Sequence, residues 1–198
     1  MVTDRKEKII LGIVGKRASG KNIISNFLIN DFAFCEIVFS DSIREILKIL
    51  AIPPSRENLS WFITKMRKRF GEELLAQMAI SKIEKMTNKV VICNGLRRKA
   101  EIVILKRTFK QNFLLLNLNC DDRARFLRIK KREASQKESK DKLNPTLIEF
   151  LKDEQSIETE KEIDEIQKMA DYTIMNNGNF DDLKREVTNF VKKRINKK

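Results

Sequence analysis

The chain has 198 residues, a formal net charge of +13 and no histidine. This length is enough for one sizeable core, and no uninterrupted apolar stretch reaches the roughly 18 residues of a membrane-spanning helix. The lack of histidine excludes histidine-based acid–base catalysis, catalytic triads and most zinc sites. The three cysteines lack metal-ligand spacing and are expected to be buried thiols in a reducing compartment. The opening MVTDRKEK has no apolar signal core, so a cytoplasmic location without membrane contact is expected.

Short apolar runs alternate with longer amphipathic segments along the chain. The runs expected to be strands are Lys8–Val14, Phe34–Phe39, Lys89–Cys93, Phe113–Leu118 and Tyr172–Met175. The segments expected to be helices are Lys21–Asn30, Asp41–Leu50, Asn58–Phe70, Glu72–Met86, Arg98–Phe109, Arg123–Arg132, Thr146–Met169 and Asp181–Ile195. Apolar strands separated by helices indicate a parallel sheet covered on both faces, so the predicted class is α/β. The polar stretch Arg132–Pro145 has no apolar period and is expected to be a flexible loop.

The stretch GIVGKRASGKNIISNF follows the first predicted strand and has the spacing of a phosphate-binding loop. Its two outer glycines allow backbone angles closed to other residues, so that successive N–H groups face inward and cradle phosphate oxygens. The lysine after the second glycine is expected to reach the β- and γ-phosphates of ATP. The residues expected to bind ATP here are Gly15, Lys16, Arg17, Ala18, Ser19, Gly20, Lys21 and Asn22. Strand, loop, lysine and helix occur in register, which favours phosphate binding over a tight turn that binds nothing.

Four further motifs follow in order. They are FSDSIREIL (Phe39–Leu47), VVICNGLRR (Val90–Arg98), RFLRIKKR (Arg125–Arg132) and ADYTIMNNGNFDDLKREV (Ala170–Val187). With the loop, they make the chain resemble the P-loop nucleoside monophosphate kinase-like superfamily, and within it dephospho-coenzyme A kinases and deoxynucleoside monophosphate kinases. The loop GKRASGKN is nearest to loops of some deoxynucleoside and phosphomevalonate kinases.

This resemblance implies a three-layer P-loop kinase sandwich with a five-stranded parallel sheet in the order 2-3-1-4-5. It also implies a single domain over residues 1–198, with an acceptor-binding helical region at about 41–87 and a helical or loop lid at about 123–150.

The acceptor side is expected to use Asp41, Arg44 and Arg97. Asp41 and Arg44 are three residues apart, so on a helix they share a face. After a strand they would face the crevice where α/β sheets bind ligands. By resemblance, Asp41 would orient or deprotonate the acceptor, and Arg44 would hold an acceptor phosphate. Helix capping by Ser40 or Asp41 is the alternative role. Of the two arginines after Gly95, Arg97 is favoured for the acceptor and Arg98 is expected to be solvated.

The expected lid carries a basic stripe, Arg125, Arg128 and Arg132, at helical spacing. By resemblance, Arg128 would stack on adenine, and Arg132 would meet the transferring phosphate as a catalytic residue beside Lys21 and Asp41. An ordinary solvated helix face is the alternative. Asn177, in the turn after the last strand, would lie near adenine, although a plain turn is an equal alternative.

Two positions depart from the family pattern. The loop position that normally carries Ser or Thr is Asn22, and the third-strand position that normally carries Asp is Asn94. Both usual groups serve Mg²⁺, the expected cofactor. An asparagine carbonyl can ligate a hard cation without supplying charge, and Mg²⁺ is often coordinated mainly by water and substrate phosphates. Asn22 and Asn94 are therefore the candidate metal positions, and either a working or a weakened catalyst is compatible with them.

These observations predict an ATP-dependent kinase whose acceptor is a small phosphorylated or nucleotide-like molecule. Dephospho-coenzyme A and a deoxynucleoside monophosphate are the leading acceptors, and the sequence does not choose between them. The first alternative is a nucleotide-binding ATPase or switch with little kinase activity. A nucleic-acid-binding protein is disfavoured, because few aromatic residues accompany the basic cluster and no nucleic-acid-binding motif is present.

Overall fold

The computed structural model describes residues 8–135, 146–156 and 162–195. Residues 1–7 and residues 136–145 of the expected flexible loop lie outside this part of the chain. The strands are β1 Ile9–Val14, β2 Cys35–Val38, β3 Val90–Asn94, β4 Phe113–Asn119 and β5 Tyr172–Met175. The α-helices are α1 Lys21–Phe32, α2 Asp41–Ile49, α3 Arg56–Phe70, α4 Leu74–Lys85, α5 Lys99–Phe109, α6 Asp122–Ser135, α7 Leu147–Ser156, α8 Ile163–Lys168 and α9 Phe180–Phe190.

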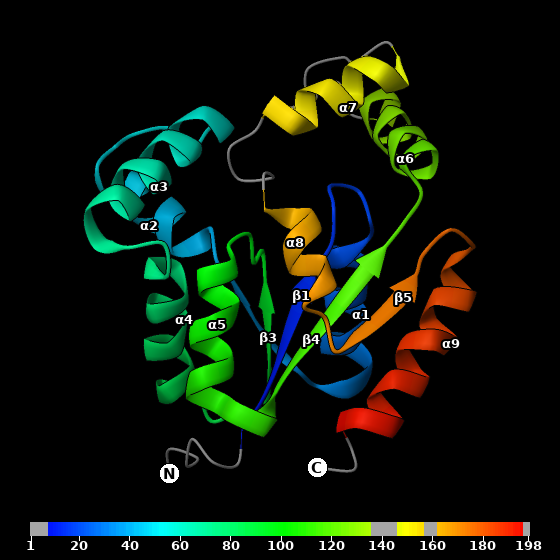
Figure 1. Cartoon of the computed structure of the whole chain (residues 1–198), viewed down its shortest axis with the longest axis horizontal. Coiled ribbons are helices and arrows are strands. Elements are labelled where there is room, and N and C mark those ends of the chain that lie inside the picture. Colours follow the sequence, from blue (N-terminus) through cyan, green and yellow to red (C-terminus); the bar gives the residue numbers. More distant parts are fainter. Residues whose placement is uncertain (1–7, 136–145, 157–161, 196–198) are drawn as a thin grey trace.

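The five strands form one parallel sheet in the order β2-β3-β1-β4-β5 (Figure 1). The predicted fold class and strand order are thereby confirmed. The central strand β1 is buried along its whole length, as expected of a strand that has neighbours on both edges and helices on both faces.

Two apolar cores lie on opposite faces of this sheet. On one face, alternate residues of β1, β3 and β4 pack against apolar residues of α2, α3, α4, α5 and α8. On the other face, the intervening strand residues pack against α1 and α9. This alternation gives the three-layer arrangement, because successive side chains of a strand point to opposite faces.

The carboxyl ends of the strands meet at one edge, and the helices that follow them rise on either side. Figure 1 shows α2 and α3 on one side of this edge and α6 with α7 on the other. The helix α1 begins at the same edge, directly after β1. In open α/β sheets this edge is where ligands bind.

Three expectations about local structure are wrong. The predicted single helix Thr146–Met169 is two helices, α7 and α8, because Phe150 packs against α6 and the phosphate-loop region, whereas Ile163 and Ile166 pack against the sheet. The helix α6 continues to Ser135, into the predicted loop. Cys35 is partly exposed, although Cys93 and Cys120 are buried.

A further expectation concerned membrane spans. Across the described residues, the structure contains no helix with the length and apolar character needed to cross a membrane.

Candidate functional site

The phosphate loop (residues 15–20) joins β1 to α1 through backbone angles that favour glycine. Gly15 has a φ of 150° and Gly20 a φ of 105°, and Ala18 between them is left-handed with a φ of 61°. A Cβ atom at Gly20 would lie 2.5 Å from Nδ2 of Asn176, and one at Gly15 would overlap a backbone carbonyl of β4. Both positions therefore require glycine for backbone angle and for space.

Lys21 lies across this loop. Its Nζ donates hydrogen bonds to the carbonyl oxygens of Gly15, at 2.7 Å, and Lys16, at 3.0 Å. Gly20 is the N-cap of α1, no side chain of the described residues caps this helix, and the first turn contains no acidic residue. The positive end of α1 thus faces the loop beside an ammonium group, which is the physical basis of an anion site.

The rear of the phosphate loop is tied to the end of β5. Asn176 is buried, and its Nδ2 donates to the carbonyl of the buried Ser19 at 2.7 Å. Arg128 of α6 donates to the Asn176 carbonyl at 2.7 Å and to the Ala18 carbonyl at 3.4 Å. These contacts place Arg128 against the loop, where its role toward adenine stays a prediction. Asn177 instead accepts from the backbone N–H of Asp121 at 2.9 Å and fixes the neighbouring turn.

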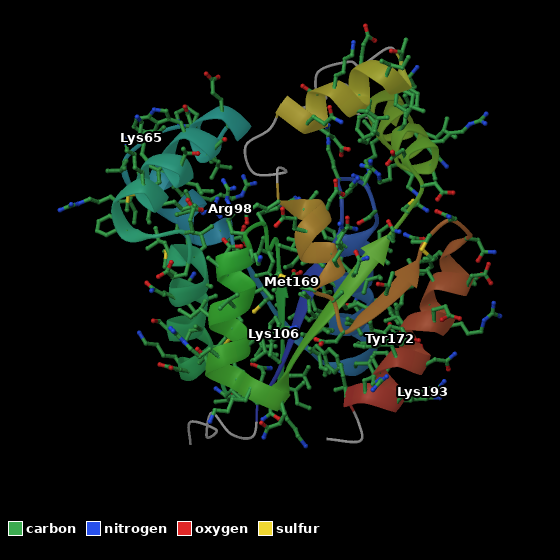
Figure 2. All side chains as sticks on the ribbon, in the orientation of Figure 1. Lys65, Arg98, Lys106, Met169, Tyr172 and Lys193 are labelled. Atoms are coloured by element: carbon green, nitrogen blue, oxygen red, sulfur yellow. The ribbon has the colours of Figure 1, made fainter. Side chains whose placement is uncertain are left out.

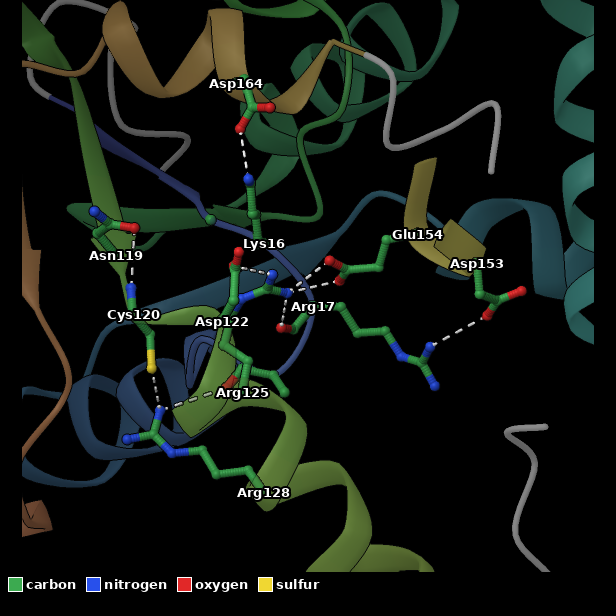
Figure 3. A network of polar contacts seen from close by, with 12 residues as sticks. Lys16, Arg17, Asn119, Cys120, Asp122, Arg125, Arg128, Asp153, Glu154 and Asp164 are labelled. Atoms are coloured by element: carbon green, nitrogen blue, oxygen red, sulfur yellow. Dashed lines mark hydrogen bonds and ion pairs between the residues drawn. The ribbon is translucent and has the colours of Figure 1, made fainter. Parts of the chain in front are cut away.

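Acidic residues after the expected lid meet the two basic side chains of the loop (Figure 3). Lys16 Nζ lies 2.8 Å from a carboxylate oxygen of Asp164, at the start of α8. Arg17 pairs with Asp153 of α7 at 3.9 Å, and its guanidinium carbon lies 5.9 Å from the ring centre of Phe150. The loop is therefore contacted from α7 and from α8 by groups of opposite charge.

Arg125 does not belong to an exposed basic stripe, which corrects the sequence expectation. It is fully buried and donates to both carboxylate oxygens of Glu154, at 2.7 and 2.9 Å, and to Asp122 at 2.5 Å (Figure 3). Burial acts to lower the pKa of Arg125, but these two carboxylates outweigh it and the pKa is raised. Arg125 also donates to the Arg17 carbonyl at 3.1 Å, so it joins α6 and α7 to the phosphate loop. Arg132, farther along α6, is exposed.

The two candidate metal positions lie side by side. Nδ2 of Asn94 donates to Oδ1 of Asn22 at 3.2 Å and to Oε1 of Glu36 at 2.9 Å. Asn94 is buried at the end of β3, Asn22 is exposed in the first turn of α1, and Glu36 is half-buried on β2. The residues there supply oxygen donors, the kind that Mg²⁺ prefers. Among the described residues, no group of three or more histidine, cysteine, aspartate or glutamate side chains could hold a metal ion.

On the acceptor side, Asp41 and Arg44 form an exposed ion pair. Nε of Arg44 lies 3.7 Å from Oδ1 of Asp41, and their side chains are 47% and 54% exposed. They do share a helix face. Ser40 is the N-cap residue but makes no capping hydrogen bond with its side chain. Asp41 therefore stands in the first turn, at the edge where β2 ends.

The two arginines after β3 have different surroundings. Arg97 is half-buried, and its contact with an acceptor stays a prediction. Arg98 was expected to be solvated, and this is wrong: its side chain is 8% exposed and lies 3.3 Å from Glu72 and 3.0 Å from Glu162. Arg98 turns inward because carboxylates of two other segments meet it there.

A buried ion pair lies next to Arg98. Arg67 of α3 and Glu101 of α5 are 3% and 0% exposed and approach to 2.7 Å. The other oxygen of Glu101 accepts from the backbone N–H groups of Arg97 and Arg98, at 2.8 and 3.1 Å. Burial raises the pKa of Glu101, and Arg67 opposes this shift. The segment after β3 is thus fixed to the start of α5 and to α3.

No family model matches this chain. A UPF0200 protein of Methanoculleus marisnigri is 30% identical over 126 residues, which are 64% of this chain and 68% of that protein. The chain belongs to the UPF0200 family. A UPF0200 protein of Pyrococcus horikoshii is 28% identical over 188 residues, 93% of this chain and 97% of its own length. A UPF0200/UPF0201 protein of Archaeoglobus fulgidus is 27% identical, with 94% of this chain matched, and the chain spans 56% of its length.

Solved structures with a similar fold include shikimate kinases. That of Bacteroides thetaiotaomicron has a TM-score of 0.55 and 13% identity, covering 93% of this chain and 97% of the kinase. That of Acinetobacter baumannii, solved in complex with shikimate, has a TM-score of 0.54 and 16% identity, with 96% of each chain covered. At this identity the likeness shows the fold, so this UPF0200 chain has the P-loop kinase fold.

Sequence reasoning missed several residues that this UPF0200 chain brings to the site. Asn176 was passed over for its neighbour Asn177, because the end of β5 offers two adjacent asparagines and the sequence does not show which one turns inward. Glu36 carried a usable signal, since it is a charged residue inside the apolar strand segment CEIV. Glu101 and Arg67 lie on ordinary amphipathic helices, and no local pattern distinguishes them from solvated charges.

Proposed function

We propose that the chain is an ATP-dependent phosphotransferase that acts on a small anionic or nucleotide-like acceptor. The observation that carries this proposal is the phosphate loop: Lys21 Nζ lies across the loop carbonyls, next to the uncapped start of α1. The fold shared with shikimate kinases supports the same reaction class.

Phosphoryl transfer requires positioning and positive charge more than covalent chemistry. Lys21 would leave the loop carbonyls and hold the β- and γ-phosphates, while loop N–H groups hold the remaining oxygens. Lys16 and Arg17 are near enough to exchange Asp164 and Asp153 for phosphate. Mg²⁺, when bound with ATP, would neutralise phosphate charge, and Asn22 and Asn94 would be the oxygen donors that hold it or its waters.

The acceptor would enter from the side of α2. Asp41 and Arg44 are exposed at the edge where β2 ends, so an acceptor can reach both without displacing core residues. Arg44 would hold an acceptor phosphate or carboxylate through charge-assisted hydrogen bonds. Asp41 would orient or deprotonate an acceptor hydroxyl. Arg97 would add a second positive charge after β3, whereas Arg98 is already paired with two carboxylates.

The test is ADP release from Mg–ATP with a panel of acceptors. The panel contains deoxynucleoside monophosphates, nucleoside monophosphates, dephospho-coenzyme A, phosphomevalonate and shikimate. We expect at least one acceptor to raise ADP release well above the rate with water alone. ATP binding without acceptor-stimulated release across the whole panel would contradict the kinase proposal.

A nucleotide-binding switch is the second candidate, and the pair Asn22 and Asn94 favours it. Both positions that normally serve the metal carry neutral amides, and these amides are engaged with each other. This alternative expects tight ATP binding with negligible turnover. A variant with Asn22→Thr and Asn94→Asp that gains activity, beside an inactive wild type, would establish it over the kinase.

A further inference from the structure

Glu36 is a charged residue that the sequence analysis left unassigned, and the fold places it at the candidate metal position. It stands on the edge strand β2, in register with Ile92 of β3. Its carboxylate reaches along the strand to the amide of Asn94, with Oε1 2.9 Å from Nδ2. The same Nδ2 donates to Asn22 at 3.2 Å. Three separate segments, β2, β3 and α1, thus contribute side chains to one cluster.

This cluster accounts for the amide at position 94. A carboxylate there would face the Glu36 carboxylate at the same 2.9 Å separation, and two like charges at that distance cannot both be ionised at little cost. The asparagine instead donates a hydrogen bond to Glu36. The negative charge of the site therefore lies on β2 rather than at the end of β3.

We propose that Glu36 supplies the negative charge that holds Mg²⁺ beside the phosphate loop. This inference rests on the proposed nucleotide-dependent function and extends it to a residue of the metal site. Because Glu36 lies before the end of its strand, its carboxylate acts through water bound to the metal, which suits an ion that keeps several of its waters. Asn22 and Asn94 provide neutral oxygen donors next to this charge.

A purely structural role for Glu36 makes a different prediction. In that role the carboxylate only accepts the hydrogen bond of the buried Asn94 amide. Glutamine at position 36 retains an oxygen for this bond but removes the charge. Glu36→Gln therefore separates the two roles, and it preserves shape at a half-buried position.

The experiment measures the affinity of the full chain for the β,γ-imido analogue of ATP by calorimetry, with Mn²⁺ as the probe metal and again with EDTA. We expect Glu36→Gln to keep the affinity in EDTA and to lose about 10- to 100-fold of metal-dependent affinity. The double variant Glu36→Gln with Asn94→Asp returns the charge to β3 and should recover most of that loss. Glu186→Gln, an exposed substitution on α9, is the matched control and should bind as the wild type does.

The outcomes separate this inference from the function on which it rests. Analogue binding with unchanged metal dependence in Glu36→Gln would overturn the role of Glu36 and leave nucleotide binding intact. A double variant as weak as Glu36→Gln would also overturn it, because restored charge would then not restore the metal. No analogue binding by the wild type, with or without Mn²⁺, would overturn the proposed function and the metal role with it.

Discussion

The nucleotide side and the acceptor side of the sheet edge hold their basic side chains in different ways. In the phosphate loop, Lys21 donates to two backbone carbonyls at 2.7 and 3.0 Å, and Arg128 donates to the Ala18 carbonyl at 3.4 Å. On the acceptor side, Arg44 meets an exposed carboxylate at 3.7 Å. The first arrangement is set by the backbone, whereas the second depends on two exposed side chains.

This difference indicates which part of the site is preorganised for its ligand. An exposed ion pair contributes about 0–1 kcal/mol, so Asp41 and Arg44 can exchange each other for a ligand at little cost. The loop has its glycines and helix terminus in place before the nucleotide arrives, which lowers the ordering cost of binding, and Lys21 has only to exchange its hydrogen-bond partners. We therefore expect nucleotide affinity to respond to loop residues, and acceptor selectivity to respond to α2.

The acceptor side also contains two buried arginines, Arg67 and Arg98, that are paired with carboxylates. Arg67 pairs with Glu101, and Arg98 pairs with Glu72 and Glu162, so these contacts join α3, the start of α5 and the residue before α8. Figure 2 labels Arg98. The acceptor side thus combines a buried network around Arg67 and Arg98 with the exposed pair Asp41 and Arg44. Four substitutions test the buried network, the phosphate loop, the exposed pair and the strand β3, in order of decreasing effect.

The largest effect is expected for Arg67→Ala, which leaves the Glu101 carboxylate buried without its cationic partner. Removal of one member of a buried pair destabilises by about 3–5 kcal/mol. Arg67 opposes the burial-induced rise in the pKa of Glu101, so its loss raises that pKa further. A raised carboxyl pKa favours folding at low pH, and the deficit should therefore be smaller at pH 5 than at pH 8.

Urea unfolding of Arg67→Ala at the two pH values measures this deficit. Arg69→Ala, on the exposed face of the same helix, is the control and should change stability by less than about 0.5 kcal/mol. If both variants unfold alike, the buried pair of Arg67 and Glu101 does not stabilise the acceptor side.

Lys21→Ala tests the preformed nucleotide side. Loss of a positive charge aimed at the transferring phosphate should lower phosphoryl transfer about 100- to 1,000-fold and weaken ATP binding, while the fold stays intact. ADP release and calorimetric titration with ATP measure the two effects. Lys193→Ala, in the C-terminal segment labelled in Figure 2, is the control. Unchanged affinity and turnover in Lys21→Ala would remove the phosphate loop from the proposed function.

Arg44→Ala tests the exposed pair of α2. If Arg44 holds the acceptor through a charge-assisted hydrogen bond, the acceptor KM should rise about 10- to 100-fold, with a much smaller change in the KM for ATP. Lys48→Ala removes an exposed charge one turn farther along α2 and serves as the control. Steady-state kinetics with each substrate varied in turn decide the matter. Equal effects on both substrates would place Arg44 on the nucleotide side.

The same contrast explains which parts of the molecule the sequence could predict. The alternation of strands and helices and the phosphate loop depend on local patterns: apolar runs, two glycines at a fixed spacing and a helix that starts directly after them. The sheet order was predicted from the resemblance to the kinase superfamily. Arg98 and Arg125 were misjudged because their partners Glu162 and Glu154 lie 64 and 29 residues away in the chain. Pairing at such separations follows from tertiary packing, and a basic residue on a helix carries no mark of it.

Helix boundaries failed for a related reason. The segment from Thr146 to Met169 keeps an approximately helical apolar period, yet Phe150 and Ile163 pack against different parts of the molecule. Periodicity shows that a residue is buried but does not show what buries it. The nucleotide side, built mainly by the backbone, was therefore predicted in more detail than the acceptor side, which is built by distant side chains.

The smallest effect is expected at Cys93, in the strand that both sides share. Burial raises the pKa of this thiol from 9.0 to about 12. Below pH 9 the thiol is protonated in the folded and the unfolded chain. Between pH 9 and 12 the thiol ionises in the unfolded chain alone, so its contribution to stability is lost as pH rises. At pH 10.5 the loss amounts to about 2 kcal/mol relative to pH 8, at about 1.4 kcal/mol per pH unit.

Cys93→Ala lacks this group, although the small cavity lowers its stability at every pH. Urea unfolding at the two pH values should therefore show a steeper decline for the wild type than for Cys93→Ala, because all other titratable groups are the same in both proteins. Parallel declines would mean that water reaches Cys93, and that the end of β3 beside Asn94 is less rigid than the rest of the sheet.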